Sequence, residues 1–397
     1  MESQTRAYLR GRFGDHYRRT EVPPPPAANE REWGYIPWSR GDTRMVRHRS
    51  LLDLGAFGDD AGLGTFLARE RPRHVYFSAA RYDDPGADSM SGKGWREADL
   101  VFDIDADHLP AVDEETPYGE MLAAGKDALE RLLDVLERDF GFEDLTVVFS
   151  GGRGYHVHVR DPGVRPLDRE QRREVVDYVL GRDVELDSLV ETEPVGGLGR
   201  KTPAEKRTLG TDGGWSRRVH DSLVSFVDEL FELPEEDALA RLRAFDGIGK
   251  GKANAALTAV RSNYEAVAAG NVDVHPAFYQ VAKSVAERAV ERQHAPVDEP
   301  VTTDVNRLIR LPGSLHGGTG LAVTRIDREA LSTFDPLVDA VPNTFRGNEI
   351  VVDVHDPGAV ELDGDTFTVP AGELSFPEPV GMFLMARGRG EKGTEPG

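Results

Sequence analysis

The segment 100–107, LVFDIDAD, constrains the fold more than any other part of the chain. On a β-strand, alternate side chains point to opposite faces. Phe102 and Ile104 would therefore share one face, and Asp103 and Asp105 would share the other. A strand with a strongly apolar face packs that face against a core. The segment thus predicts a core strand that presents two carboxylates near its end.

Two carboxylates spaced in this way have Cα atoms ~7 Å apart. Their side chains can converge on a pair of divalent cations, as in two-metal enzymes. Burying like charges side by side is costly unless a cation compensates them. In a chain with 70 acidic residues, a solvated acidic strand face is the plainer alternative. The apolar opposite face favours a metal site.

A glycine-rich hairpin is the second informative feature. Residues 145–150 and 155–160 are typical of two strands, and the turn between them is Gly-Gly-Arg-Gly. Glycines allow a ligand to approach the backbone closely. With Ser150, Arg153 and His156 at its base, the turn is a candidate triphosphate cradle. An ordinary tight hairpin is the alternative, and His158 fits a half-buried histidine equally well.

The third feature is the segment 298–321, DEPVTTDVNRLIRLPGSLHGGTGL. It brings a further carboxylate, then arginines, then Ser-Leu-His in a turn bounded by proline and glycine. Both Asp298 and Asp304 qualify as a third metal ligand by spacing. On one strand Arg307 and Arg310 would point to opposite faces, so only one of them would enter a site. Alone, the segment also fits a surface strand and loop.

The net charge bears on what the protein can bind. The chain has 397 residues and a formal net charge of −22, which repels phosphate backbones at low salt. At molar salt the Debye length falls to ~3 Å, and short-range contacts then decide binding. The acidic excess is spread along the chain, and this favours a cell that works in concentrated salt over a protein that never meets nucleic acid.

The absence of cysteine excludes disulfides, thiolate zinc sites and iron–sulfur clusters within this chain. The first 20 residues lack the apolar run of a signal peptide. No stretch approaches the ~20 apolar residues that a membrane span needs. We therefore expect a cytoplasmic protein that does not contact a membrane.

Taken together, the three features resemble the signature of the small, catalytic subunit of the archaeal and eukaryotic DNA primase. The motifs are the acidic strand, then SGGRGYH at 150–156, then RLIRLPGSLHGGTG at 307–320. YFSAARYD at 76–83 and KGWREADLVFDIDADH at 93–108 are most similar to the archaeal branch. The resemblance covers roughly residues 1–325 and is weakest through the helical region.

The resemblance implies a template-dependent nucleotidyltransferase that synthesises short primers de novo on single-stranded DNA for replication. It implies that Asp103 and Asp105 bind two Mg²⁺ or Mn²⁺ ions, with Asp298 as the third carboxylate ligand. The residues that would hold the incoming nucleoside triphosphate are Ser150, Arg153, His156, Arg310 and His316. REWGY and RMVRHRSL resemble the family's opening block, which adds Glu32 and Arg47 beside the site, Arg47 as a further nucleotide-binding residue.

Two departures from the family pattern matter. Related archaeal subunits often carry a Cys/His zinc knuckle soon after the aspartates, whereas this chain has no cysteine there. We expect no structural zinc held by cysteine, and a His/carboxylate site around His108 stays open. The family's usual lysine after Ser-Leu-His-Gly is replaced by Gly318, so one basic contact to substrate is missing or is supplied elsewhere.

We expect an α/β fold, with two mixed-sheet units flanking a cleft and a helical subdomain inserted in mid-chain. Helices are predicted at 1–20, 118–140 and 275–294, an extended run at 301–311, and a loop at 196–212. The expected divisions are residues 1–165 and 271–382 for the catalytic body, 166–270 for the helical subdomain and 383–397 for a disordered tail.

The resemblance also implies partners, namely an iron–sulfur-containing large subunit in a heterodimer, a single-stranded DNA template and nucleoside triphosphates. Three other functions share part of the pattern. A repair primase-polymerase has the same acidic and glycine motifs but extends existing ends. A DxD glycosyltransferase has the aspartates but no use for the glycine hairpin. A subunit that only binds DNA has no need of intact carboxylates.

Overall fold

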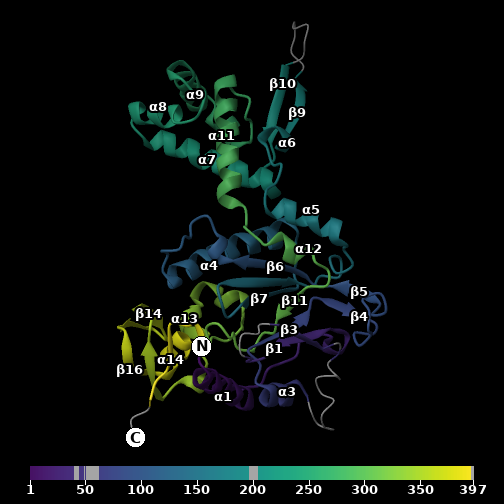
Figure 1. Cartoon of the computed structure of the whole chain (residues 1–397). Coiled ribbons are helices and arrows are strands. Elements are labelled where there is room, and N and C mark those ends of the chain that lie inside the picture. Colours follow the sequence, from purple (N-terminus) through teal and green to yellow (C-terminus); the bar gives the residue numbers. More distant parts are fainter. Residues whose placement is uncertain (40–43, 49, 51–61, 196–203, 395–397) are drawn as a thin grey trace. The chain divides into compact units, whose positions relative to one another are not determined.

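A computed structural model describes residues 1–39, 44–48, 50, 62–195 and 204–394 of the protein (Figure 1). The chain forms two compact units. Unit 1 comprises residues 1–129, 143–176 and 297–397, and unit 2 comprises residues 130–142 and 177–296. No helix in the described parts of the chain has both the length and the hydrophobicity needed to cross a bilayer.

Unit 1 is built on two four-stranded antiparallel sheets. The first has the order β12 (Thr324–Ile326), β7 (Leu145–Phe149), β8 (Gly154–Val159) and β6 (Leu100–Asp105). The second has the order β11 (Leu308–Arg310), β3 (His74–Ser78), β1 (Trp33–Ile36) and β2 (Val46–His48). Smaller sheets join β4 (Ala80–Tyr82) to β5 (Trp95–Ala98), β14 (Gly358–Leu362) to β15 (Asp365–Val369), and β13 (Glu349–Val354) to β16 (Gly372–Pro377) and β17 (Gly390–Lys392).

The acidic strand forms as its pattern predicts. In β6, Phe102 and Ile104 are fully buried, whereas Asp103 and Asp105 are half-buried. On the aspartate face, Val101 packs with Ala79, Val301 and Ile309, which belong to neighbouring parts of unit 1. The apolar residues thus anchor the strand on both faces, and the carboxylates emerge only at its end.

The helices of unit 1 cover these sheets. They are α1 (Ser3–Arg19), α3 (Leu63–Glu70), α4 (Tyr118–Asp134), α5 (Arg169–Val179), α12 (Glu299–Thr303), α13 (Pro336–Asp339) and α14 (Glu378–Ala386). Helix α4 continues into unit 2 as a π-helical turn over Val135–Asp139. The helix predicted at 118–140 is therefore present with its last turn widened.

Two expectations for unit 1 need correction. In place of a disordered tail at 383–397, the structure has the end of α14 and the strand β17, while residues 395–397 lie outside the described residues. Every residue of α14 is buried, so its apolar run MFLMA serves the core. The run at 301–311 is only partly extended, because α12 occupies its start and β11 its end.

Unit 2 is mainly helical, as expected for the middle of the chain. Its elements are α6 (Leu186–Leu189), β9 (Val190–Val195), β10 (Ala204–Leu209), α7 (Gly214–Glu232), α8 (Glu235–Arg243), α9 (Lys250–Ser262), α10 (Tyr264–Ala268) and α11 (Pro276–Gln293). An apolar core of its own holds these helices together, built around residues such as Phe226, Leu257 and Phe278.

The loop predicted at 196–212 is only partly present in unit 2. Strands β9 and β10 form an antiparallel hairpin there, which replaces the loop from residue 204 onwards. Residues 196–203 lie outside the described residues. Unit 2 also extends past the expected boundary at residue 270, because α11 packs against α7 and α9.

The α/β class is confirmed, with one difference in strand direction. We expected mixed sheets, but every strand pair among the described residues is antiparallel. Period-two alternation identifies a strand without revealing the direction of its partner. The hairpin turn at 151–154 is a local signal that requires an antiparallel pair.

Candidate active site

Three of the predicted carboxylates lie close together in unit 1. Asp103 and Asp105 stand at the end of β6, with side chains 24% and 34% exposed. Asp298 is exposed at the start of α12, and its backbone N–H donates to the carbonyl of Asp103 at 2.9 Å. This bond ties two segments that are almost 200 residues apart in the chain.

The pKa values of the two strand aspartates are raised by burial and by neighbouring acids. Burial raises the pKa of Asp103 to about 6, and the charge of Asp298 adds to this rise, while Arg310 and Arg307 oppose it. Burial also raises the pKa of Asp105 to about 6, helped by the neighbouring Asp107. Ionised carboxylates at these positions therefore lack full compensation within the protein.

The glycine hairpin lies directly beside this strand. Asp103 is opposite His156 and Asp105 is opposite Gly154 in the β6–β8 register. A Cβ on Gly154 would lie 1.8 Å from the carbonyl oxygen of Ile104, so only glycine fits there. Because position 154 is glycine, the β8 backbone can pair directly with the part of β6 that carries the carboxylates.

The backbone donors of the hairpin are partly used inside the turn. The Ser150 hydroxyl oxygen accepts the N–H groups of Gly152 and Gly154, each at 3.3 Å. Two N–H groups of the candidate triphosphate cradle are thus tied to Ser150. Ser150 thus shapes the turn, and its own hydroxyl proton is left for a ligand.

His156 faces the carboxylates from the middle strand. Its Nε2 atom lies 3.4 Å from a carboxylate oxygen of Asp103. Burial lowers the pKa of His156 to about 3, and the charges of Arg310 and Arg307 lower it further. The ring is therefore neutral at physiological pH and can donate one hydrogen bond without adding charge.

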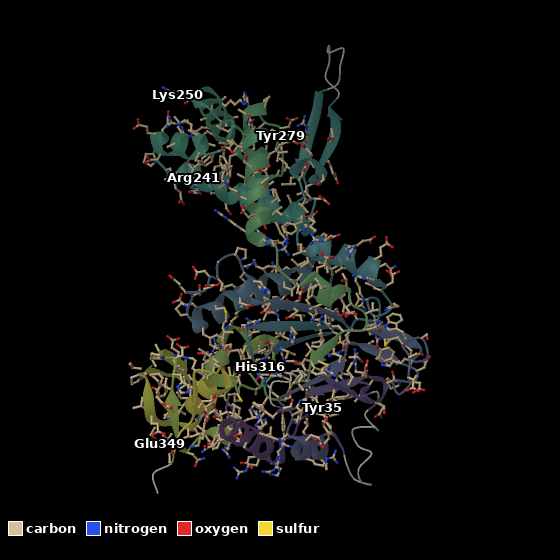
Figure 2. The ribbon with its side chains drawn as sticks, viewed as in Figure 1. Tyr35, Arg241, Lys250, Tyr279, His316 and Glu349 are labelled. Carbon is tan, nitrogen blue, oxygen red and sulfur yellow. The ribbon has the colours of Figure 1, made fainter. Side chains whose placement is uncertain are left out.

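His316, labelled in Figure 2, packs against the tip of the hairpin. A Cβ on Gly152 would lie 3.0 Å from the Nε2 atom of His316. The Nδ1 atom of His316 lies 3.1 Å from the Thr319 hydroxyl, which in turn donates to the Gly151 carbonyl at 2.5 Å. Burial holds the pKa of His316 well below its usual value. These contacts fix the Ser-Leu-His turn to the glycine turn.

Arg310 and Arg307 both act on the same groups. Each lowers the pKa of Asp103 and of His156 through its charge. Strand alternation predicted that only one of them would face the site. Of the two, Arg310 lines the pocket that Asp103 also lines and Arg307 does not, which agrees with that prediction. No described residue accepts a hydrogen bond from the buried Nε–H group of Arg310.

These residues line one pocket of about 260 Å³. The predicted residues in its walls are Asp103, Asp105, Ser150, Arg153, His156, Arg310 and His316. Asp298 does not line the pocket, although it adjoins Asp103. The pocket therefore gathers side chains from all three sequence motifs.

Arg47 lies elsewhere. Its guanidinium binds both carboxylate oxygens of Glu32, at 2.8 and 2.7 Å, and Lys93 binds the same carboxylate at 2.9 Å. Neither Arg47 nor Glu32 is among the residues that line the pocket. The role predicted for Arg47 in nucleotide binding stays a prediction.

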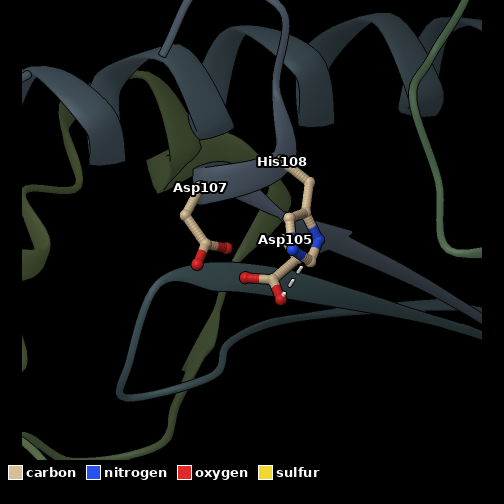
Figure 3. Close-up of side chains that lie close together, drawn as sticks. All are labelled: Asp105, Asp107 and His108. Carbon is tan, nitrogen blue, oxygen red and sulfur yellow. Dashed lines mark ion pairs between the residues drawn. The ribbon is translucent and has the colours of Figure 1, made fainter. Parts of the chain in front are cut away.

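A second potential metal group overlaps the first. The ligand atoms of Asp105, Asp107 and His108 all lie within 4.8 Å of one another (Figure 3). Asp107 also forms an ion pair with Arg153, which partly neutralises it. His108 is exposed, with its Nδ1 atom 3.8 Å from a carboxylate oxygen of Asp105. The group has the composition to hold a divalent cation at the rim of the pocket.

One charged residue of the pocket was missed by the sequence reasoning. Arg387, directly after α14, lines the same pocket. It lies in the segment that we expected to be disordered, far from the three motifs. No local pattern indicates it, because only the packing of α14 in unit 1 brings it there.

The residues fit divalent cations. Carboxylate oxygens are the ligands that Mg²⁺ and Mn²⁺ prefer. The raised pKa values of Asp103 and Asp105 indicate charge that a cation would compensate. An α/β body whose carboxylates share one pocket with arginines and neutral histidines has the groups that a metal-dependent phosphoryl-transfer enzyme would use.

Comparison with known proteins identifies the family. Residues 102–328 match the family model described as DNA primase small subunit. Curated proteins named DNA primase small subunit PriS are similar over their whole length. The relative from Haloarcula marismortui is 65% identical and that from Natronomonas pharaonis 62%, each over 100% of both chains. The relative from Methanothrix thermoacetophila is 39% identical over 99% of this chain and 100% of its own.

The chain belongs to the DNA primase small subunit family. The resemblance stated from the motifs is thereby confirmed, and the family is one of enzymes. Haloarcula and Natronomonas are halophiles, which agrees with the origin inferred from the acidic composition. The family assignment favours a primase over the DxD glycosyltransferase and over a subunit that only binds DNA.

Proposed function

We propose that this chain is the catalytic subunit of a primase, which synthesises short primers de novo on single-stranded DNA by two-metal phosphoryl transfer. The observation that carries the proposal is the single pocket that joins Asp103 and Asp105 to the hairpin and to the segment of Arg310 and His316. The hydrogen bond between the backbones of Asp298 and Asp103 supports a shared site for the third carboxylate.

Asp103, Asp105 and Asp298 would hold the Mg²⁺ or Mn²⁺ ions. Bound there, such ions lower the pKa of a 3′-hydroxyl and offset charge on the departing pyrophosphate. The protein's part is to hold the carboxylates in place. The packed strand β6 and the backbone bond from Asp298 both serve this purpose.

The triphosphate of the incoming nucleotide would lie against the hairpin. Arg153 and Arg310 supply charge-assisted hydrogen bonds to phosphate oxygens. His156 and His316 are neutral, so they donate hydrogen bonds and add no charge that would hold the product. Ser150 offers its hydroxyl proton from the base of the turn.

The partners follow from the family. A primase small subunit implies a large subunit and a DNA template. We propose that the large subunit carries the iron–sulfur domain and forms a heterodimer with this chain. This chain has no cysteine with which to hold such a cluster.

The test is primer synthesis on a primer-free single-stranded template in molar KCl, with the variants Asp103→Asn and Asp105→Asn. Each variant removes charge and preserves volume, so dinucleotide formation should disappear while the fold remains intact. Asp144→Asn is the matched control, because Asp144 is an exposed aspartate of unit 1 that lines no part of the pocket.

Normal dinucleotide synthesis by both site variants would refute the proposal. The primer-free template also separates the primase from a repair primase-polymerase, because an enzyme that only extends existing ends makes no product from it.

A further inference from the structure

We propose that Arg387 binds the phosphate groups of the incoming nucleoside triphosphate, as a third arginine of the pocket besides Arg153 and Arg310. The proposal rests on the proposed function and extends it to the C-terminal segment of the chain. Its basis is the position of Arg387 in the pocket wall, the way α14 is anchored, and the charges around the guanidinium.

The helix before Arg387 is firmly held in unit 1. All nine residues of α14 are buried. Its first residue, Glu378, accepts hydrogen bonds from the Tyr8 hydroxyl at 2.5 Å and from Arg12 at 2.5 and 2.9 Å. Asn348 donates to the same carboxylate at 3.2 Å. A helix fixed in this way sets the position of the residue that follows it.

The Arg387 guanidinium is positioned by aromatic rings. It lies 4.5 Å from the centre of the Tyr118 ring and 5.4 Å from that of Phe383. Cation–π contacts of this kind orient an arginine, and Arg387 also donates a hydrogen bond to the Tyr118 side chain. The part of the chain that the structure describes offers Arg387 no carboxylate at ion-pair distance. Its charge is therefore available to an anionic ligand.

Tyr118 connects Arg387 to the glycine hairpin. The Tyr118 hydroxyl donates a hydrogen bond to the carbonyl of Gly152, at the tip of the turn. Burial raises the pKa of Tyr118 to about 12, even though Arg387 and Arg153 oppose the rise. Tyr118 thus stays neutral at physiological pH and does not neutralise Arg387. Tyr118 contacts the guanidinium through its ring and the turn through its hydroxyl.

The charges of the pocket favour an anion beside Arg387. Arg153 already forms an ion pair with Asp107 and lies 3.9 Å from Asp105, so much of its charge is offset within the protein. Gly318, on the same pocket wall, contributes no side chain. A nucleoside triphosphate carries several negative charges, and Arg387 adds a cation that no described carboxylate offsets.

Arg387 also lies in the wall between two pockets. Besides the site pocket, it lines an adjoining pocket of about 520 Å³, together with Tyr118, Phe383 and Arg389. Truncation to alanine would merge the two spaces and confuse loss of charge with loss of a wall. The informative variants are therefore Arg387→Gln, which removes the charge, and Arg387→Lys, which keeps it.

Arg389→Gln is the matched control. Arg389 lies two residues further on and lines only the adjoining pocket, where it contacts the backbone carbonyls of Asp356 and Ala359. The Arg389→Gln variant removes a charge from the same segment without changing the proposed site. Thermal melting of each variant shows whether the fold is unchanged.

The experiment is calorimetric titration of the full chain with a non-hydrolysable nucleoside triphosphate and Mn²⁺, then with the nucleoside monophosphate, then with a single-stranded oligonucleotide. For Arg387→Gln we expect triphosphate binding about tenfold weaker, as for the loss of one charged hydrogen bond. Monophosphate and oligonucleotide affinities should change less than twofold. Arg387→Lys should recover most of the loss, and Arg389→Gln should bind as the parent does.

Three results would overturn the proposal. In the first, Arg387→Gln binds the triphosphate as tightly as the parent. In the second, it loses triphosphate and monophosphate affinity equally and melts at a lower temperature, which indicates a structural role. In the third, only oligonucleotide binding weakens, which assigns Arg387 to the template backbone. None of these three results contradicts the proposed function, because that proposal is tested separately with Asp103→Asn and Asp105→Asn.

Discussion

Asp99 carries a buried charge network directly before the strand of the candidate site. The carboxylate is 1% exposed and accepts two hydrogen bonds from Arg31, at 2.9 and 3.1 Å, and one from Arg160 at 2.9 Å. Arg31 is itself 1% exposed. Burial alone would raise the pKa of Asp99, but His158 and the two arginines outweigh burial and hold that pKa well below its usual value.

We predict that Asp99→Asn destabilises unit 1 by about 3–5 kcal/mol, the usual cost of removing one partner from a buried ion pair. Asparagine preserves the volume and one acceptor oxygen, so the loss reflects the missing charge opposite Arg31. Domains of ordinary size are stable by only about 5–15 kcal/mol. The variant should therefore unfold at a clearly lower urea concentration, and β6 should lose its fixed position with it.

The assay is urea unfolding followed by tryptophan fluorescence in molar KCl. Three of the four tryptophans, Trp33, Trp38 and Trp95, belong to unit 1, so the signal reports mainly on that unit. Molar salt screens exposed pairs strongly and buried pairs much less. Asp144→Asn is the control, and we expect it to lie within about 0.5 kcal/mol of the parent.

A loss below about 1 kcal/mol for Asp99→Asn would refute this reasoning, because it would mean that the buried arginines need no counter-charge. The double variant Arg31→Met/Asp99→Asn adds a second check. Removing both charges should recover part of the loss, since the uncompensated cation is then gone.

Three further predictions concern pH, metal and the hairpin. Burial lowers the pKa of His16 to about 4. Below about pH 6.5 the unfolded histidine therefore binds protons before the folded one, and the parent should lose stability as the pH falls. In His16→Asn, the urea midpoint of unfolding should fall less steeply with decreasing pH. With metals chelated at pH 7, Asp103→Asn should be more stable than the parent by ~1–3 kcal/mol, because burial raises the pKa of Asp103 and penalises its ionised form. Calorimetric melts at pH 4 should show no such difference in stability. Added Mn²⁺ should stabilise the parent and leave the variant unchanged. Gly154→Ala should lower the melting temperature markedly, since its Cβ would meet the Ile104 carbonyl, whereas Gly163→Ala, with open space around its Cβ, should melt as the parent does.

The parts of the site that follow from local patterns were predictable. Alternation in 100–107 identifies β6 and the face of its carboxylates, and the Gly-Gly-Arg-Gly turn identifies the hairpin. Both depend on period-two geometry and on glycine's conformational range, which act over a few residues. Gly151 does adopt a positive φ of 75°, as a tight turn requires.

The parts that depend on long-range packing were not. Arg387 reaches the pocket because α14 is buried and held by Tyr8 and Arg12 from the other end of the chain. No spacing near residue 387 encodes these contacts. Asp298 and Asp304 were equivalent by spacing alone, and only the resemblance chose between them. The bond from the Asp298 backbone to Asp103 lies at the start of α12, whose residues 301–303 the sequence suggested would be extended.

The two ends of unit 1 are joined, and this bears on how the chain is made. The Lys392 N–H donates to the Thr5 hydroxyl at 2.8 Å, and β17 completes the sheet of β13. Unit 2 lies wholly between residues 130 and 296. On the ribosome, unit 2 can thus fold while the first 129 residues still wait for strands not yet synthesised. The acids of β6 emerge early, but the wall of their pocket is complete only after Arg387, which follows α14, has been synthesised.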